Sequence, residues 1–361
     1  MQSRTRTIIQ GTGSYLPTRV VENRAFLDRP FHLDYGEPID RAENERVIEK
    51  FREITGISAR RWVTDDLVAS DMGAAAADAA LTDAGIDPET LDYIVVAHNF
   101  GDVAASNPRH DFCPTLAARI KQELGIRNPW CVAYDLPFGC PGWLQGVIQA
   151  EQFFRAGDGR RALVVGTETL SRVSDPADRD SMLYSDGAGA AVLEAVESDG
   201  PVGVLSHVAR SDTLEHARLL RMGPSYDRGI EPDRIFLKMR GRKLYQYAVQ
   251  TVPGVVEESL NRASVGLDDV AKILIHQANE KMDEAIVRRL FQRNGRDDVP
   301  ERIMPMTISW LGNSSVATLP TLLDLVRRGD LDDHRMDPGD VVVFASVGAG
   351  MNVNALVYRV P

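Results

Sequence analysis

An internal repeat constrains the fold of this chain more than any other feature of its sequence. Residues 80–98 (ALTDAGIDPETLDYIVVAH) align without a gap with residues 259–277 (SLNRASVGLDDVAKILIHQ), at an offset of 179 positions. The same offset places residues 163–166 over residues 342–345. Each long stretch has the pattern of a helix end, a turn and a short apolar strand. Two matches at one offset indicate that the chain contains two similar α/β halves.

The two halves, which we assign to residues 1–195 and 196–361, predict where an active site lies. Strands that alternate with helices pair in parallel, with the helices on the faces of the sheet. Sheets of this kind bind ligands beyond the carboxyl ends of their strands. Polar side chains that directly follow a strand in either half are therefore candidates for one shared site at the junction of the halves.

Composition excludes several classes of function. The net charge is −11, which argues against nucleic-acid binding by bulk charge. Three cysteines, an odd number without metal-ligand spacing, favour a reducing cytoplasm over a disulfide framework or a metal site. The sequence has no apolar run of about 18 residues and no secretory pattern near its start, so we expect neither a membrane span nor export.

Cys140 lies in the stretch DLPFGCPGW, residues 135–143, between a predicted strand and a predicted helix. The strand is expected at residues 130–134. Apolar periodicity over residues 143–154 predicts a buried helix, with Pro141 at its first position. The unpaired N–H groups and the dipole of a helix N-terminus stabilise a thiolate or hold an oxyanion. Cys140 is therefore a candidate nucleophile, and the alternative is a buried, inert cysteine.

Two further polar residues occupy comparable positions in the second half. His276 directly follows a predicted strand at residues 271–275, and Asn313 lies in the turn WLGNSS before a predicted helix at residues 316–326. Polar residues at such positions are candidates for the shared site at the junction of the halves. The alternatives are a histidine that satisfies backbone groups at a strand end and an asparagine that caps a helix.

The remaining elements of the first half carry less information about function. We expect a first strand at residues 6–11, a helix at residues 70–84 and a buried strand at residues 91–96. Residues 23–49 are polar and irregular. We interpret them as an excursion from the core that contains short helices.

Two glycine-rich stretches, residues 185–195 (SDGAGAAVLEA) and 346–360 (SVGAGMNVNALVYRV), each resemble half of a phosphate-binding loop. A dinucleotide fingerprint requires a helix after the glycines, but both stretches continue as apolar, strand-like segments. We therefore reject dinucleotide binding at these glycines. Hairpin turns that bring backbone N–H groups close to a ligand are expected instead.

Taken together, these motifs resemble the β-ketoacyl-acyl carrier protein synthase III family. The resemblance rests on DLPFGCPGW around Cys140, HQAN at His276, GNSS at Asn313 and GAGMNVNAL near the end, in this order and spacing. GTGSYLP, ITGI and DPADRDSMLYSDGAGAAVLEA also match, so the resemblance spans essentially the whole chain. It implies a thiolase-like fold, in which two duplicated α/β halves with mixed sheets sandwich buried helices. This agrees with the repeat.

The resemblance implies a decarboxylating Claisen condensation in fatty acid, specialised lipid or secondary metabolite biosynthesis. Cys140 would accept an acyl group from a thioester. His276 and Asn313 would donate hydrogen bonds to the thioester oxygen of a malonyl extender and stabilise the enolate that forms as carbon dioxide leaves. The backbone N–H groups of Cys140 and Ala349 would hold the oxyanion at the acyl carbon. No cofactor and no metal are implied.

The resemblance also implies partners and binding residues. The substrates would be small-molecule thioesters of coenzyme A and an acyl carrier protein, and the enzyme would be a cytoplasmic homodimer. Arg179 matches a residue that contacts the coenzyme A nucleotide. Lys281, Arg288 and Arg289, on the predicted helix after HQAN, match basic residues at which the carrier protein docks.

Other positions distinguish this chain within the family it resembles. Pro137 and Phe138 replace small residues near the nucleophile, and Lys50 replaces an aromatic residue that stacks on adenine. Cys113, beside Phe112, occupies the position of a phenylalanine that closes the partner subunit's acyl pocket. A pocket opened in this way would favour acyl groups longer than acetyl, because each buried methylene gains about 0.8 kcal/mol. The alternative is that Phe112 or the nearby insertion fills the gap.

The thiol of Cys140 needs activation. A cysteine with a pKa of about 8.5 is only a few per cent thiolate at neutral pH. Lowering its pKa by about two units requires about 2.7 kcal/mol. A helix N-terminus supplies about 0.3–1 kcal/mol, or about 2 kcal/mol at best. We therefore expect His276 to share this work.

Three alternatives to this function remain. The chain could be a condensing enzyme or acyltransferase that uses coenzyme A esters alone. It could be a non-catalytic thiolase-fold partner subunit, although the intact Cys–His–Asn trio argues against that. A cysteine hydrolase with the same trio is the third alternative, and the duplicated α/β pattern disfavours it.

Overall fold

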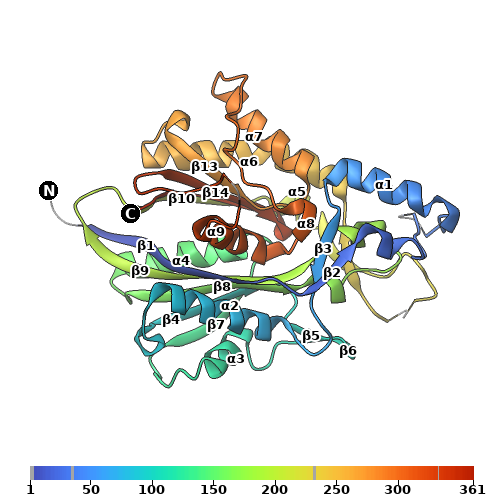
Figure 1. The fold of residues 1–361 in the computed structure, drawn as a ribbon, viewed down its shortest axis with the longest axis horizontal. Coiled ribbons are helices and arrows are strands. Elements are labelled where there is room, and N and C mark those ends of the chain that lie inside the picture. Colours follow the sequence, from blue (N-terminus) through green and yellow to red (C-terminus); the bar gives the residue numbers. More distant parts are fainter. Residues whose placement is uncertain (1–3, 34–35, 231–232, 332) are drawn as a thin grey trace.

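Two mixed β-sheets form the core of the computed structural model, which describes residues 4–33, 36–230, 233–331 and 333–361 (Figure 1). The first sheet has the strand order β1-β9-β8-β4-β7, in which β4 pairs in parallel with β8 and with β7. β9 is antiparallel to both of its neighbours. The strands of this sheet are β1 (Arg4–Tyr15), β4 (Tyr93–His98), β7 (Val132–Pro137), β8 (Arg161–Thr169) and β9 (Asp186–Ser198).

The second sheet repeats most of this arrangement, with the order β10-β15-β14-β13. β13 and β14 are parallel, and β15 is antiparallel to β14 and to β10. Its strands are β10 (Gly203–Ser211), β13 (Val270–Ile275), β14 (Val341–Gly348) and β15 (Asn352–Arg359). The short antiparallel pairs are β2 (Arg19–Glu22) with β3 (Ala59–Trp62), β5 (Asp102–Ala104) with β6 (Asn107–Asp111), and β11 (Leu220–Gly223) with β12 (Phe236–Met239).

Helices separate and cover the two sheets (Figure 1). α4 (Gly142–Ala156) and α9 (Thr318–Arg328) lie between the sheets. α2 (Ala69–Ala84) and α3 (Leu116–Glu123) cover the outer face of the first sheet, and α6 (Gly241–Ala263) and α7 (Glu280–Arg293) cover that of the second. The expected sandwich of mixed sheets around buried helices is confirmed. The remaining helices are α1 (Asn44–Thr55), α5 (Thr213–His216) and α8 (Ile308–Leu311).

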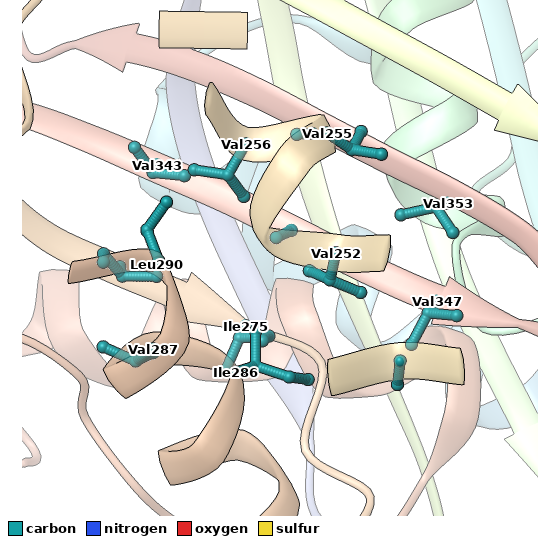
Figure 2. Packing of buried hydrophobic residues seen from close by; sticks show 14 of the residues in the cluster. Val252, Val255, Val256, Ile275, Ile286, Val287, Leu290, Val343, Val347 and Val353 are labelled. Carbon is teal, nitrogen blue, oxygen red and sulfur yellow. The ribbon is translucent and has the colours of Figure 1, made fainter. Parts of the chain in front are cut away.

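A stripe of valines attaches α6 to the second sheet. Val252, Val255 and Val256 recur with the spacing that places residues on one helix face, and each is at most 4% exposed. Full burial of such a side chain contributes about 1.5–3 kcal/mol. Packing of this kind holds α6 against the face of the second sheet. Figure 2 shows these valines with their neighbours from β13, β14, β15 and α7: Ile275, Val343, Val347, Val353, Ile286, Val287 and Leu290.

The repeat in the sequence corresponds to equivalent elements of the two sheets. Residues 80–98 contain the end of α2 and all of β4, and residues 259–277 contain the end of α6 and all of β13. Residues 163–166 lie in β8 and residues 342–345 in β14, each of which pairs in parallel with the preceding aligned strand. Residues 199–202 connect β9 to β10, a few positions after the point at which we divide the chain.

Several predicted boundaries agree with the structure, and one is wrong. The strand expected at residues 130–134 is β7, which begins at Val132 and continues to Pro137. Trp130 is excluded from it because its N–H donates to Oδ1 of Asn128 in a turn, which leaves the indole 84% exposed. The elements expected at residues 6–11, 70–84 and 91–96 correspond to β1, α2 and β4.

The two glycine-rich stretches differ in structure. Residues 346–360 turn between β14 and β15 through the short 3-10 helix Ala349–Met351, as expected. The hairpin turn expected within residues 185–195 is wrong, because this stretch is part of β9. Its glycines allow close packing instead: a β-carbon on Gly189 would lie 2.6 Å from the backbone nitrogen of Thr321 in α9.

Residues 23–49 pack against the rest of the protein through a small hydrophobic cluster that is separate from the main cores and includes Val21 and Met182. Short 3-10 helices at Asn23–Phe26 and Arg41–Glu43 precede α1, so the expected short helices are confirmed. Phe26 and Phe31 are at most 1% exposed and pack with Met182. Residues 34 and 35 of this segment lie outside the described part of the chain.

Candidate active site

Cys140 lies in the turn between β7 and α4, half-buried, as its sequence context predicts. Pro141 is the residue before the first helical position rather than that position itself, because α4 begins at Gly142. The turn is closed by a hydrogen bond from the N–H of Gly142 to the carbonyl of Gly139. Gly139 has a φ of +77°, a conformation that favours glycine. The nucleophile candidate is therefore held on a tight, defined turn.

Two backbone loops meet beside the sulfur. A β-carbon on Gly348 would lie 2.5 Å from the Cys140 nitrogen, and one on Gly139 would lie 2.8 Å from the Ala349 nitrogen. Real β-carbons do not approach so closely, so glycine is required on both sides of this contact. The contact brings the backbone of Cys140 next to that of Ala349, the two residues expected to provide an oxyanion hole.

His276 directly follows β13, an edge strand of the second sheet. Its backbone N–H donates to the carbonyl of Ala345 in β14 at 2.9 Å. The side chain is 3% exposed, and Nδ1 has no hydrogen-bond partner in the described part of the chain. Nδ1 therefore does not satisfy a backbone group, contrary to the alternative interpretation of this histidine. Burial lowers the pKa of His276 to about 4, so the imidazole is neutral at physiological pH.

Asn313 is fixed from three directions. Its backbone N–H donates to the carbonyl of Leu183 at 2.9 Å, and its carbonyl accepts the N–H of Ser185 at 2.8 Å. Its Oδ1 accepts the N–H of Ser315 at 2.8 Å and so closes a turn that precedes the 3-10 helix Ser315–Ala317 and α9. The side-chain oxygen therefore caps the start of a helix, as the alternative interpretation of this asparagine expected. The Nδ2 group makes no hydrogen bond among the described residues and remains available as a donor.

The thiol of Cys140 is not activated in the expected way. Burial raises its pKa to about 11, and the negative charge of Glu168 acts in the same direction. No hydrogen bond joins His276 to the sulfur in the residues described. Two hydrogen-bond donors favour the thiolate: the hydroxyl of Ser315, whose Oγ donates to Sγ of Cys140 at 3.4 Å, and the backbone N–H of Cys140 itself.

Three residues of this site were not identified from the sequence: Asn99, Glu168 and Ser315. Asn99 follows β4 and donates from its backbone and its side chain to the carboxyl group of Glu168, near the end of β8. Its Nδ2 also donates to Oγ of Ser315 at 3.0 Å. Burial raises the pKa of Glu168 to about 8. Both Asn99 and Glu168 lie at carboxyl ends of strands in the first sheet, a signal that was available in the sequence.

The residues expected at the nucleotide site lie on exposed surface. Arg179 begins a 3-10 helix, Arg179–Leu183, and Lys50 lies on α1. A cavity of about 480 Å³ is lined by Phe26, Arg29 and Ser181, among others, and none of the Cys–His–Asn trio borders it. The segment 23–49 therefore contributes to this cavity.

The three basic residues expected to dock a carrier protein, Lys281, Arg288 and Arg289, are exposed on α7. None of them forms an ion pair with a described residue, and the pair that Glu284 could form with Arg288 is not present. Their charges therefore remain available to an acidic partner.

Cys113 and Phe112 are exposed on the loop between β6 and α3, and Phe112 is 48% exposed. The ring of Phe112 lies 5.8 Å from that of His98 and 6.2 Å from that of His110, between centroids. No hydrogen bond links Cys113 or Phe112 to the trio within the described ranges. The structure thus brings Cys140, Asn313 and Ala349 close together and leaves this pair at the surface.

The described residues contain neither a candidate membrane span nor a candidate metal site. No helix there has both the length and the apolar character needed to cross a membrane. No cluster of three or more histidine, cysteine, aspartate or glutamate side chains there could hold a metal ion.

Sequence comparisons match this chain over almost its full length. The family model for 3-oxoacyl-[acyl-carrier-protein (ACP)] synthase III matches residues 134–213, and the model for the C-terminal part of that family matches residues 260–360. The beta-ketoacyl-[acyl-carrier-protein] synthase III of Paracoccus denitrificans is 33% identical over 358 residues, which cover 98% of this chain and 99% of the relative. The protein of the same name from Erythrobacter litoralis is 33% identical over 357 residues, with the same coverage.

Solved structures share the fold. The 3-oxoacyl-[acyl-carrier-protein] synthase III of Aquifex aeolicus superposes with a TM-score of 0.78 at 27% identity, over 98% of this chain and 99% of that one. The priming β-ketosynthase of the R1128 polyketide biosynthetic pathway gives 0.79 at 30% identity, over 100% and 98%. The expected thiolase-like fold is thereby confirmed.

Proposed function

Because this chain belongs to the 3-oxoacyl-[acyl-carrier-protein] synthase III family, we propose that it catalyses a decarboxylating Claisen condensation between an acyl thioester and a malonyl thioester. One observation carries the proposal most. A cysteine on a strand-to-helix turn lies within hydrogen-bond distance of the turn that holds Asn313, and the backbone of Ala349 lies beside it. Nucleophile, amide donor and oxyanion donors thus come together from both halves of the chain.

In the first half-reaction, the sulfur of Cys140 attacks the carbonyl carbon of the acyl thioester. A carbon–sulfur bond forms, the bond to the donor's sulfur breaks, and the donor leaves as a thiol that carries the proton lost by Cys140. The N–H groups of Cys140 and Ala349 stabilise the negative oxygen of the intermediate. The close contact of the Gly139 and Gly348 loops supports this placement.

In the second half-reaction, the carbon–carbon bond to the malonyl carboxylate breaks and carbon dioxide leaves. Its electron pair forms an enolate, whose carbon attacks the acyl carbonyl on Cys140 and expels the cysteine sulfur as a thiolate. The product is a 3-oxoacyl thioester. Because the electrons come from the broken carbon–carbon bond, the reaction needs no cofactor and no metal.

His276 and Asn313 stabilise the enolate by donating hydrogen bonds to the thioester oxygen. Two properties of the residues support this role. The lowered pKa of His276 keeps the imidazole neutral, so it needs no countercharge in a buried site. The Nδ2 group of Asn313 is its free donor, because Oδ1 is occupied by Ser315. Neither group places a negative charge next to the enolate.

The acyl donor is a thioester of coenzyme A or of a carrier protein, and the extender is malonyl-acyl carrier protein. Arg179 provides an exposed cation for the donor's nucleotide phosphates. Lys281, Arg288 and Arg289 form the carrier dock, since acidic partners are steered by exposed, unpaired cations. The relatives compared above carry the carrier protein in their names.

Reversal of charge at Arg288 and Arg289 to glutamate is expected to raise KM for malonyl-acyl carrier protein about tenfold, because it removes electrostatic attraction. The KM for malonyl-coenzyme A should stay unchanged. Arg335→Glu is the matched control, since it reverses an exposed charge on the loop before β14, beside the amino end of β13 rather than on α7. Steady-state kinetics with both extenders measure the effect. An equal change for both would mean that this surface does not dock the carrier.

The assembly we propose is a cytoplasmic homodimer. β7 is an edge strand of the first sheet, and Trp130 and Val132 beside it are 84% and 52% exposed. An edge with exposed apolar side chains is a surface for pairing with another chain. Cys113 and Phe112, which are exposed in the same half of the chain, would then close the partner's acyl pocket. The thiol of Cys113 would leave room in that pocket for acyl groups longer than acetyl. All three cysteines are free thiols, as in a reducing compartment.

The function is tested with a panel of acyl thioesters, both on coenzyme A and on carrier protein, with acyl chains of about two to twelve carbons. Intact mass is measured before and after addition of malonyl-acyl carrier protein. The expected result is an adduct that persists alone and is consumed, with release of carbon dioxide and a 3-oxoacyl product, when the extender arrives. Loss of the adduct to water would indicate a hydrolase. No adduct from any donor would indicate a non-catalytic subunit.

A further inference from the structure

The hydrogen bonds around Cys140 form a chain with a fixed direction. Glu168, which is fully buried, accepts from the backbone N–H and the side-chain amide of Asn99. The same amide nitrogen donates its second hydrogen to Oγ of Ser315 at 3.0 Å. Because Asn99 supplies a donor to this oxygen, the hydroxyl hydrogen of Ser315 is free to point elsewhere. It points to Sγ of Cys140, at 3.4 Å.

The backbone of Ser315 is equally constrained. Its φ is +54°, a left-handed conformation that residues other than glycine seldom adopt. Its N–H is held by Oδ1 of Asn313 at 2.8 Å, which stabilises the conformation. Strained backbone of this kind persists where the surrounding contacts over-determine it, and it concentrates at functional sites. The strain here places one hydroxyl group against one sulfur.

We propose that Ser315 is a catalytic residue whose hydroxyl stabilises the Cys140 thiolate, and that Asn99 and Glu168 are positioning residues that orient this hydroxyl. The inference deepens the proposed condensation and rests on it for the role of Cys140. In the acylation step, the hydroxyl would hold the sulfur's negative charge until the carbon–sulfur bond forms. It would receive that charge again when the sulfur leaves in the second half-reaction.

The direction of the effect follows from the groups that face the sulfur. Glu168 on β8 opposes the thiolate when ionised, and Asp186 on β9 raises the pKa of Glu168. Tyr184, after the 3-10 helix Arg179–Leu183, also lies within electrostatic range of Cys140, and it stays neutral because its pKa is raised well above 10. The Ser315 hydroxyl favours the charged sulfur by a hydrogen bond, and it is the side chain that does so in the described part of the chain, beside the backbone N–H of Cys140 itself.

Alkylation of Cys140 by iodoacetamide tests the proposal without any acyl substrate. The label is counted on the peptide that contains Cys140, so reaction at the exposed Cys113 does not interfere. Ser315→Ala and Ser315→Gly are compared with wild type, and the glycine variant relieves the left-handed strain. Ser314→Ala is the matched control, because the Ser314 hydroxyl lies 3.3 Å from Oγ1 of Thr318 rather than against the sulfur.

Both Ser315 variants should shift the pH dependence of alkylation upward by about one pH unit, which corresponds to a tenfold lower thiolate population. The intrinsic reactivity of a more basic thiolate offsets part of this loss, so the rate at pH 7 should fall about threefold. Ser314→Ala should leave the rate unchanged. A wild-type rate in Ser315→Gly, with an unchanged melting temperature, would overturn the proposal.

Glu168→Gln supplies an independent test of the positioning chain. Because the pKa of Glu168 is about 8, its charge appears above that pH and opposes the thiolate. In wild type the rise of the alkylation rate should therefore flatten above about pH 8, and in Glu168→Gln the rise should continue. A wild-type flattening that persists in the variant would contradict the chain. If alkylation changes as expected but the protein shows no condensation activity, the proposed function is wrong and the role of Ser315 at the sulfur is still supported.

Discussion

Replacement of Cys140 by alanine is expected to abolish the covalent acyl adduct completely. No other cysteine has the required surroundings. Cys113 is exposed on a loop and Cys131 is 2% exposed. Among the described residues, Cys140 is the cysteine with the Ser315 hydroxyl and the Ala349 backbone beside it. Intact mass after incubation with an accepted acyl thioester measures the loss.

Cys113→Ala and Cys131→Ala are the controls, and both should still acquire the acyl mass. The substitution at position 140 removes a half-buried sulfur without disturbing the turn, because Gly139 and Pro141 remain. An adduct on Cys140→Ala that maps to either of the other cysteines would refute the assignment of the nucleophile.

Removal of the extender donors should produce the second largest effect. His276→Ala and Asn313→Ala are each expected to slow decarboxylation of the malonyl thioester by about 10²–10³-fold, the usual cost of losing one donor to a developing oxyanion. Acylation of Cys140 should slow much less. Carbon dioxide release and adduct formation, followed separately, distinguish the two steps.

Asn313→Asp sharpens this test. The aspartate keeps an oxygen that can accept the N–H of Ser315, but it replaces the free Nδ2 donor by a negative oxygen. Decarboxylation should therefore be lost while the turn is retained. If Asn313→Ala slows both steps equally and Asn313→Asp restores both, the role of the residue is to hold the turn.

The pKa of His276 adds a pH signature to the same step. Because burial lowers that pKa to about 4, the imidazole stays neutral from about pH 5 upward. Single-turnover decarboxylation on acylated enzyme should be independent of His276 ionisation between pH 6 and pH 8. A fall in rate that follows a group with a pKa near 6.5 would show that the histidine titrates at its ordinary value.

The fold could be predicted from the sequence because the information is local and repeated. Residues 80–98 and 259–277 carry the same succession of helix, turn and strand, and both form it. Cys140 and His276 were accessible for a related reason, since His276 directly follows β13 and Cys140 lies in the turn just after β7. Sequence patterns report such positions well.

The state of the thiol could not be predicted in this way. It depends on Glu168 and Ser315, which are 28 and 175 positions away along the chain and reach the sulfur only through tertiary packing. Residues 185–195 show the same limit. In the sequence their glycines are typical of a turn, but in the structure glycine is needed because α9 packs directly against β9.

The fixed turn at Asn313 resolves an ambiguity that every carboxamide presents. An amide side chain rotated by 180° has the same shape, but it would offer an oxygen to the enolate and repel it. Only the oxygen can accept the N–H of Ser315, and Leu183 and Ser185 pin the backbone on both sides, so the flipped rotamer loses a hydrogen bond in a buried site. The protein thereby determines which end of the Asn313 amide faces the enolate, although the two ends have nearly the same shape. A glutamine at this position, with one more rotatable bond, would forfeit that choice.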